Sequence, residues 1–163
     1  MTATTKPGIH ELEQYVYNEA RLIDEKRWDE WAALFTEEGE YWVPASRAQP
    51  NPTEHVSIVY EQSLLRAVRL KRYNHPNAMS LQPVPYSVHL ISNVMLDSYD
   101  EVEQVSIVNS RFIMLEYRRD KQQTFGGAVT HTLERADDSW KIRQKKVELV
   151  NCDAALSSIQ IYF

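Results

Sequence analysis

The chain has 163 residues, of which 43% are hydrophobic and 25% charged, and this composition excludes a wholly disordered protein. The length is enough for one domain with one sizeable core, so we expect a single domain over residues 1–163. The formal net charge of −5 argues against nucleic acid as a partner, because non-specific binding needs a basic face to displace counterions from phosphates.

The first third of the chain has the periodicity of amphipathic helices. A stripe with i, i+3, i+4 spacing predicts the first helix; it is apolar except for one glutamate and consists of Leu12, Tyr15, Val16, Glu19, Leu22 and Ile23. A second helix is expected from Trp28 to Phe35, with Gly39 as its stop. Prolines predict loops over 45–53 and 75–85, with a third helix between them over about 57–72. Its expected inward residues are Ile58, Leu64, Leu65, Val68 and Leu70.

The second half of the chain changes to the sequence pattern of strands. Four segments rich in β-branched and aromatic residues, joined by short polar links, predict strands over 87–99, 102–119, 122–135 and 140–150. In the second of these strands, five apolar residues fall on the same set of alternate positions: Val105, Ile107, Ile113, Leu115 and Tyr117.

Two features predict irregular strands, and the order of the elements predicts the fold class. The pair Gly126-Gly127 predicts a bulge or sharp bend. A parity change between Ile142 and Val147 predicts a bulge in the last strand. Helices first and an antiparallel meander afterwards are typical of an α+β fold, here a strongly curved, mainly antiparallel sheet packed on three helices of the N-terminal half.

Side chains that could perform chemistry are not grouped in the sequence. There is no Gly-rich phosphate loop and no G-x-S-x-G turn, and a single cysteine, Cys152, cannot ligate an iron–sulfur cluster. No two of the five histidines lie within four residues of each other, which argues against a metal site in this chain. Because Cys152 also cannot form an intramolecular disulfide and the first residues hold no apolar signal segment, we expect a cytoplasmic chain. No apolar run reaches the ~18 residues of a membrane span, so no membrane partner is expected.

A cofactor-free pocket enzyme is an alternative. A curved sheet over helices encloses an interior in which His89, His131, Asp97 or Tyr41 could act as an acid or base. We expect each histidine instead to be satisfied by a neighbouring backbone group, and Asp97 leads into an acidic turn that favours solvent. A roomy cavity with a His–Asp contact would favour a stand-alone lyase or isomerase, whereas an interior filled by large side chains would not. A bound ligand without an acid–base pair would indicate a small ligand-binding module.

Aromatic residues gather in the segment "GEYWVPASR" (39–47). Tyr and Trp are enriched at subunit contacts because they bury apolar area and keep a polar tip. We therefore expect this segment and the end of the chain, "SSIQIYF" (157–163), to contact a neighbouring subunit, the latter as a strand at an interface or at the edge of the chain's own sheet. The expected interface residues are Tyr41, Trp42, Pro44, Arg47, Ile159, Ile161 and Phe163.

Three stretches resemble the small, or β, subunit of aromatic-ring-hydroxylating dioxygenases, which are Rieske non-haem iron oxygenases. They are "LIDEKRWDEWAALFTEEGEYWVP" (22–44), "SVHLISNV" (87–94) and the closing hairpin and tail (131–156). Together they cover most of the chain in the family's order. The absence of a long N-terminal extension is more similar to the benzoate and salicylate members than to the biphenyl members.

The resemblance implies a cone of the nuclear transport factor 2 (NTF2-like, cystatin-like) type, related to scytalone dehydratase. It implies a non-catalytic structural β subunit of the oxygenase component, supporting hydroxylation of a benzoate- or salicylate-like compound in aromatic catabolism. In the family the α subunit carries the Rieske [2Fe–2S] cluster, the mononuclear Fe(II) and the substrate pocket, and NADH supplies electrons through a reductase. Three β subunits form a trimer under three α subunits, an α3β3 hetero-hexamer. No catalytic, cofactor-binding or metal-binding residue is carried over to this chain.

Overall fold

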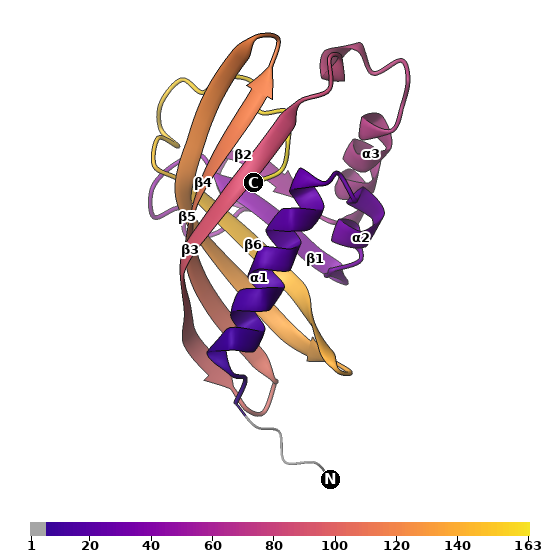
Figure 1. The fold of residues 1–163 in the computed structure, drawn as a ribbon. Coiled ribbons are helices and arrows are strands. Elements are labelled where there is room, and N and C mark those ends of the chain that lie inside the picture. Colours follow the sequence, from indigo (N-terminus) through magenta and orange to yellow (C-terminus); the bar gives the residue numbers. More distant parts are fainter. Residues whose placement is uncertain (1–5) are drawn as a thin grey trace.

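A computed structural model describes residues 6–163 as three helices packed on a curved six-stranded sheet (Figure 1). The elements are α1 (Ile9–Asp24), α2 (Trp28–Ala32), β1 (Phe35–Pro44), β2 (Ser57–Glu61), α3 (Ser63–Tyr73), the 3-10 turn η1 (Met79–Leu81), β3 (Tyr86–Asp100), β4 (Val105–Arg118), β5 (Lys121–Ala136) and β6 (Ser139–Leu149). The strand order is β2-β1-β6-β5-β4-β3. Only the β1–β6 pair among these described strands is parallel. The predicted α+β class, with a mainly antiparallel sheet and three helices in the N-terminal half, is confirmed.

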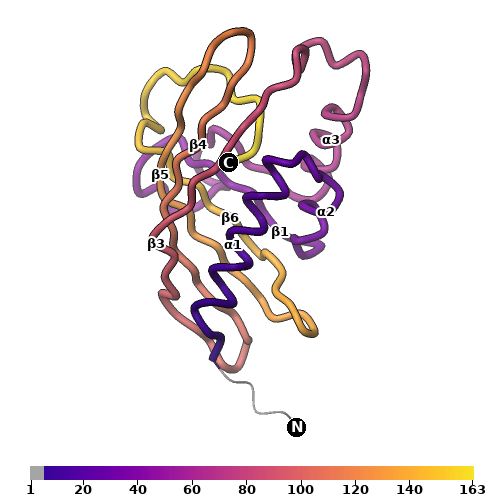
Figure 2. Tube along the Cα trace, in the orientation of Figure 1, coloured from indigo at the N-terminus to yellow at the C-terminus, as the bar shows by residue number. Residues whose placement is uncertain are grey.

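The long helix α1 lies across the concave side of the sheet (Figures 1 and 2). Its predicted stripe is the buried face, and Leu12, Val16 and Ile23 are at most 1% exposed. Burying a side chain of this size stabilises the fold by about 1.5–3 kcal/mol, so the stripe fixes the position of α1 on the sheet. Glu19 is buried with them, and it therefore needs polar partners inside the protein.

The second helix is shorter than predicted. It ends at Ala32, and Phe35 already begins β1, which pairs with β6; the backbone N–H of Ile142 donates to the Leu34 oxygen at 2.8 Å. Gly39 therefore lies inside a strand and does not stop a helix. A Cβ at this position would stand 2.6 Å from the Ile142 carbonyl oxygen, so glycine is required where β1 and β6 approach each other closely.

The third helix was predicted with the wrong start and, apart from Leu70, the wrong buried face. Residues 57–61 form β2 beside β1, and α3 begins only at Ser63. Leu64, Leu65 and Val68 are 75%, 56% and 52% exposed. The residues that face inward are Leu70 and Arg66, because the Arg66 guanidinium donates to the Gly39 oxygen at 2.8 Å and stacks over the Phe35 ring.

The two predicted strand irregularities had different outcomes. The bulge in the last strand is confirmed: opposite β5, the register shifts between Thr132 and Leu133, and Arg143 is the extra residue on β6. No bulge occurs at Gly126-Gly127, where the ladder with β4 continues without a shift. A Cβ on Gly127 would lie 2.1 Å from the Glu148 oxygen, so close backbone approach explains that glycine.

The five apolar residues that occupy alternate positions of β4 lie on the outer face of the sheet. The inward residues of β4 are Ser106, Val108, Ser110, Phe112, Met114 and Glu116. On the outer face Ile113 pairs with Leu90 and Tyr117 with Tyr86, and all four are about half or more exposed. No helix among residues 6–163 is long and apolar enough to cross a membrane.

Candidate functional site

Two acid–histidine pairs lie between α1 and the sheet. Glu19 Oε2 is 3.1 Å from His131 Nε2, and Asp24 Oδ1 is 2.7 Å from His89 Nδ1. Asp24 also accepts a hydrogen bond from the His89 backbone N–H at 2.8 Å. Both histidines face the interior, as the pocket-enzyme alternative required, and each has a carboxylate partner in place of the expected backbone group.

Glu19 is the centre of the larger cluster. Its Oε1 accepts hydrogen bonds from Lys145 Nζ at 2.6 Å and from Trp31 Nε1 at 2.8 Å. Burial by itself would raise the pKa of Glu19, but the Lys145 ammonium and the His131 hydrogen bond outweigh it and hold that pKa well below its usual value. Burial lowers the pKa of His131 and of Lys145, with Glu19 opposing the change in both. The arrangement is therefore a buried ion pair with a neutral histidine beside it.

The second pair is closer to the surface. Burial would raise the pKa of Asp24, but hydrogen bonds from His89 and Ser87 hold it below its ordinary value. The other ring nitrogen of His89 and the Nδ1 of His131 are buried without a hydrogen-bond partner in the described part of the chain. Neither pair is arranged with a third group as a proton relay.

The end of the chain fills the interior of the cone. The predicted strand at 157–163 is absent, and Ile161, Tyr162 and Phe163 are at most 2% exposed. Lys145 Nζ donates to the main-chain oxygen of Phe163 at 2.5 Å, and the Phe163 N–H donates to the Tyr41 hydroxyl at 3.0 Å. We call residues 161–163 the plug.

Aromatic packing holds the plug in place. The Tyr162 ring lies 4.3 Å from Trp31 and 4.9 Å from Tyr41, centroid to centroid, and the Phe163 ring lies 5.1 Å from Phe125. Glu19 and His131 are each 1% exposed beneath these rings. The Glu19–His131 pair is therefore closed to a substrate in this structure, and a filled interior of this kind matches the outcome that argues against a pocket enzyme.

The predicted interface residues have mostly intrachain roles in this structure. Tyr41, Trp42, Pro44, Ile161 and Phe163 are buried within the chain itself. Tyr41 supports the plug, and Trp42 donates from Nε1 to Ser57 Oγ at 3.0 Å. These rings are therefore buried by the chain itself, and their contact with a neighbouring subunit stays a prediction.

Two of the predicted interface residues remain accessible. Arg47 is exposed and donates to the Val150 oxygen at 3.0 Å, and Ile159 is half-buried at the wall of a groove. Asp97 is exposed, as its acidic surroundings predicted.

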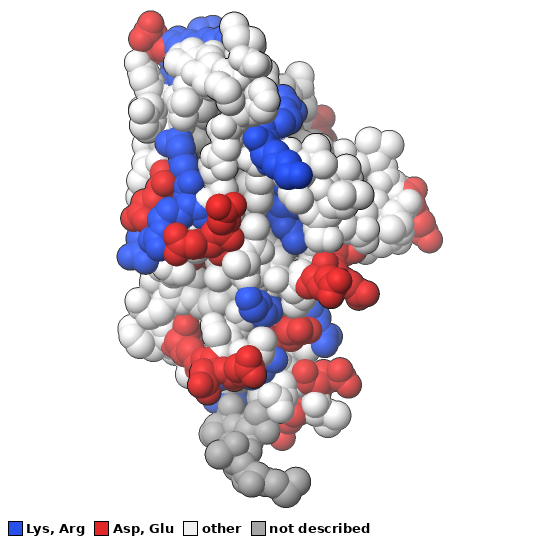
Figure 3. All heavy atoms as spheres, turned by 90° about the vertical axis from the view of Figure 1, so that its right-hand side faces the viewer, with Lys and Arg blue, Asp and Glu red and all other residues white. Residues whose placement is uncertain are grey.

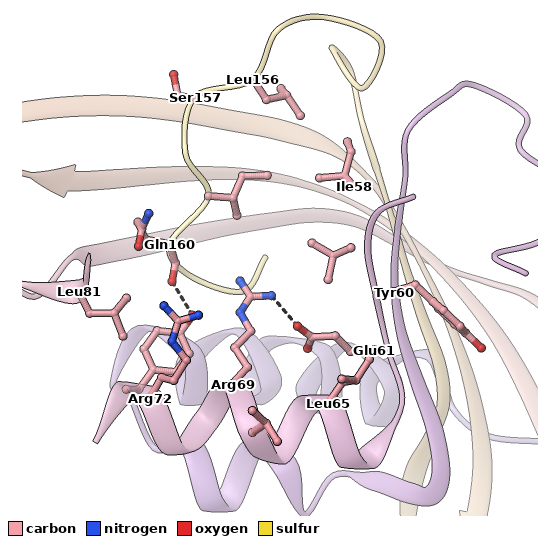
Figure 4. Close-up of a pocket in the computed structure, with 14 residues that line it drawn as sticks. Ile58, Tyr60, Glu61, Leu65, Arg69, Arg72, Leu81, Leu156, Ser157 and Gln160 are labelled. Carbon is pink, nitrogen blue, oxygen red and sulfur yellow. Dashed lines mark hydrogen bonds and ion pairs between the residues drawn. The ribbon is translucent and has the colours of Figure 1, made fainter. Parts of the chain in front are cut away.

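The groove is a surface cavity of about 670 Å³ between α3, β2 and the segment before the plug (Figure 4). Its walls are about half apolar; the apolar part includes Leu65 and Val68 of α3 and Ile159 of the segment before the plug. We call this cavity the α3 groove.

Charged side chains form one side of the α3 groove. Arg69 is 3.0 Å from Glu61 and lies over the Tyr162 ring, so its charge is already compensated. Arg72 donates to Ser80 Oγ, and among residues 6–163 no carboxylate lies within ion-pair distance of it.

Neither the groove nor the cone interior is a metal site: the described residues contain no group of three or more His, Cys, Asp or Glu side chains placed to hold a metal ion. Figure 3, which shows the side of the molecule with α2 and α3, has acidic and basic side chains interspersed with neutral surface. Cys152 is buried as a free thiol.

The fold defines the chain as an NTF2-like cone. A solved structure of the β subunit of benzoate 1,2-dioxygenase from Burkholderia mallei matches it with a TM-score of 0.76 at 23% identity, covering 91% of this chain and 94% of that one. A scytalone dehydratase-like protein of Novosphingobium aromaticivorans matches with a TM-score of 0.67 at 16% identity over 92% and 89%. The expected relation of the fold to scytalone dehydratase is confirmed.

The family model of the ring hydroxylating beta subunit matches residues 18–154, and the chain belongs to that family. It is 26% identical to the β subunit of benzoate 1,2-dioxygenase from Acinetobacter baylyi, over 95% of this chain and 93% of the relative. It is 30% identical to the β subunit of benzene 1,2-dioxygenase from Pseudomonas putida, over 77% and 72%. The Rieske cluster and the mononuclear iron of such an enzyme belong to the large subunit, which is the partner of this chain.

Sequence reasoning missed the partners of both histidines. Glu19 and Asp24 come from α1, more than sixty residues before the strands that they contact. One signal was present, because Glu19 interrupts an otherwise apolar helical stripe and a carboxylate there must be compensated. Lys145 gave no signal, since it lies in a cation-rich run that is typical of a solvated strand face.

Proposed function

We propose that the chain is the non-catalytic structural subunit of an α3β3 oxygenase, that it forms one domain over residues 1–163 and that it acts in the cytoplasm. The observation that carries this proposal is the plugged cone. Its only fully buried acid–histidine pair in the described chain is sealed by Tyr162 and Phe163, so the polar cluster stabilises the interior and does not meet a substrate. The chemistry then belongs to the large subunit, with NADH supplying electrons through a reductase.

The experiment is co-expression with the large subunit and purification through a tag on this chain. We expect an assembly with the mass of three chains of each kind, and hydroxylation by that assembly only. The isolated chain should turn over no aromatic substrate at any concentration. Turnover by the isolated chain, or failure of the two chains to co-purify, would overturn the proposal.

We infer further that the complex acts on an aromatic acid of the benzoate or salicylate type. The benzoate dioxygenase relative is matched over 93% of its length, whereas the benzene dioxygenase relative is matched over 72% of its own. Coverage over the whole length supports the aromatic-acid group, although identity over the shared part is slightly higher with the benzene relative. The test is to measure product formation by the assembled enzyme from benzoate, salicylate and benzene side by side. Benzene as the best substrate would refute the inferred preference for an aromatic acid.

A further inference from the structure

A protruding turn has the chemistry that complements the α3 groove. The turn between β3 and β4, residues 100–104, which we call the acidic turn, carries Val102 at its tip, and this side chain is 88% exposed. Exposed glutamates flank it on both sides at Glu101 and Glu103, and Asp100 precedes them. An apolar side chain between carboxylates complements a groove that combines apolar side chains with a cation lacking a carboxylate partner.

The acidic turn is already ordered in the single chain. Asp100 Oδ1 accepts hydrogen bonds from the backbone N–H groups of Val102 at 2.9 Å and Glu103 at 3.0 Å. The Arg135 backbone N–H donates to the Gln104 oxygen at 3.0 Å, while the Arg135 guanidinium contacts Glu11 and does not neutralise the turn. Because the turn is held by two long strands, docking would order few additional residues and would lose little conformational entropy.

The acidic turn cannot reach the groove of its own chain. Figure 1 places the turn at the lower end of the sheet and α3 with the final segment in the upper half. A contact between these two surfaces would therefore join two copies, with the turn of one copy against the groove of the next. A contact between two different surfaces is heterologous, and such contacts close into rings when the rotation permits.

We propose that the acidic turn of one copy docks into the α3 groove of a second copy, with Val102 between Leu65, Val68 and Ile159 and with Glu101 or Glu103 against Arg72. This inference rests on the proposed function in so far as that function includes a trimer of this chain. Volume supports the fit: the groove holds about 670 Å³, in the range of about 300–1,000 Å³ that encloses ligands of drug size and hence the tip of a turn. Charge supports the proposed contact as well. In the described chain Arg72 is the groove cation without a carboxylate partner, and the tip of the acidic turn offers two carboxylates.

The test is a charge exchange in the isolated full-length chain, followed by sedimentation equilibrium at several concentrations and two salt levels. Arg72→Glu alone, and Glu101→Lys with Glu103→Lys alone, should each raise the dissociation constant for self-association about tenfold or more, because like charges then face each other. Combining all three substitutions in one chain should return it to within about threefold of the wild type. The wild-type association should weaken as salt is raised.

Leu90→Glu is the matched control, since Leu90 is 56% exposed on the outer face of the sheet, away from both surfaces. It should leave the self-association unchanged. A wild-type chain that stays monomeric, a charge exchange without recovery, or loss of association only in Leu90→Glu would overturn the docking. Co-purification with the large subunit is a separate measurement, so a wrong docking surface and a wrong proposed function give different results.

Discussion

Replacing Lys145 by Met tests whether the buried ion pair determines the stability of the cone. Methionine keeps an unbranched apolar side chain in place of the lysine stem and removes only the ammonium. Glu19 would then keep its hydrogen bonds from Trp31 and His131 and lose the contact at 2.6 Å that compensates its charge. The main-chain oxygen of Phe163 would lose its donor as well.

The expected cost is about 3–5 kcal/mol in the free energy of unfolding, the usual effect of leaving a buried charge without its partner. This is a large part of the roughly 5–15 kcal/mol that stabilises a domain of this size. Urea denaturation at pH 7, followed by tryptophan fluorescence and by circular dichroism, measures it. High salt should change the result little, because the pair is shielded from solvent.

The double variant Glu19→Gln, Lys145→Met is the control. The introduced glutamine would be neutral, and its amide can still accept from Trp31, so the double variant should lose less stability than Lys145→Met alone although it lacks one more native group. The hydrogen bond from residue 145 to the Phe163 oxygen is missing in both the single and the double variant, so its loss cancels when their stabilities are compared. A single variant within about 1 kcal/mol of wild type, or a double variant as unstable as the sum of both changes, would refute the reasoning.

Three further predictions concern glycine, the plug and pH. Gly39→Ala should destabilise the chain by about 2 kcal/mol or more in urea melts, because its Cβ would lie 2.6 Å from the Ile142 oxygen. Gly8→Ala, with open space around the new Cβ and only the N-cap preference of α1 to lose, is the control and should cost about 1 kcal/mol or less; equal effects would contradict the close approach. Replacing both Tyr162 and Phe163 by Ala should cost about 6 kcal/mol or more and increase binding of a hydrophobic dye, whereas the same change at the exposed Val102 should do neither. A double variant with wild-type stability and dye binding would disprove the filled interior. Burial lowers the pKa of His131, so the folded state binds fewer protons than the unfolded state at mildly acidic pH. The free energy of unfolding should therefore fall as the pH drops below about 6.5, by at most ~1.4 kcal/mol per pH unit. The variant His131→Gln should reduce this slope, and an unchanged slope would show that His131 does not cause it.

The sequence allowed the fold class and the last four strands to be predicted, because strand periods and helical stripes are local signals. The prediction was wrong at residues 57–72, where the spacing of Leu64, Leu65 and Val68 is typical of a buried helix face. These three side chains are exposed, and Arg66 faces inward. Local pattern could not reveal that Gly39 and the Ile142 backbone meet, since the contact joins residues about a hundred positions apart.

The aromatic residues gave a signal that fits two kinds of site. Tyr41 was expected at a subunit contact because its ring is large and amphipathic, and the same property suits it to an interior in which it must also satisfy the main-chain N–H of Phe163. Composition alone does not distinguish an interface from a core with polar groups. The distinction needed the position of the final segment, which has no periodicity to indicate it.

The pairing of β1 with β6 also sets the order of events while the chain is being made. Phe35 leaves the ribosome about a hundred residues before its neighbour Ile142, so the edge of β1 that pairs with β6 in the finished sheet stays unpaired until then. Only when β6 has emerged can the sheet close, and only then does the space exist that Tyr162 and Phe163 occupy. Truncated translation products that lack β6 would therefore expose an unpaired strand edge. We expect chaperones to bind such products and proteases to cleave them early.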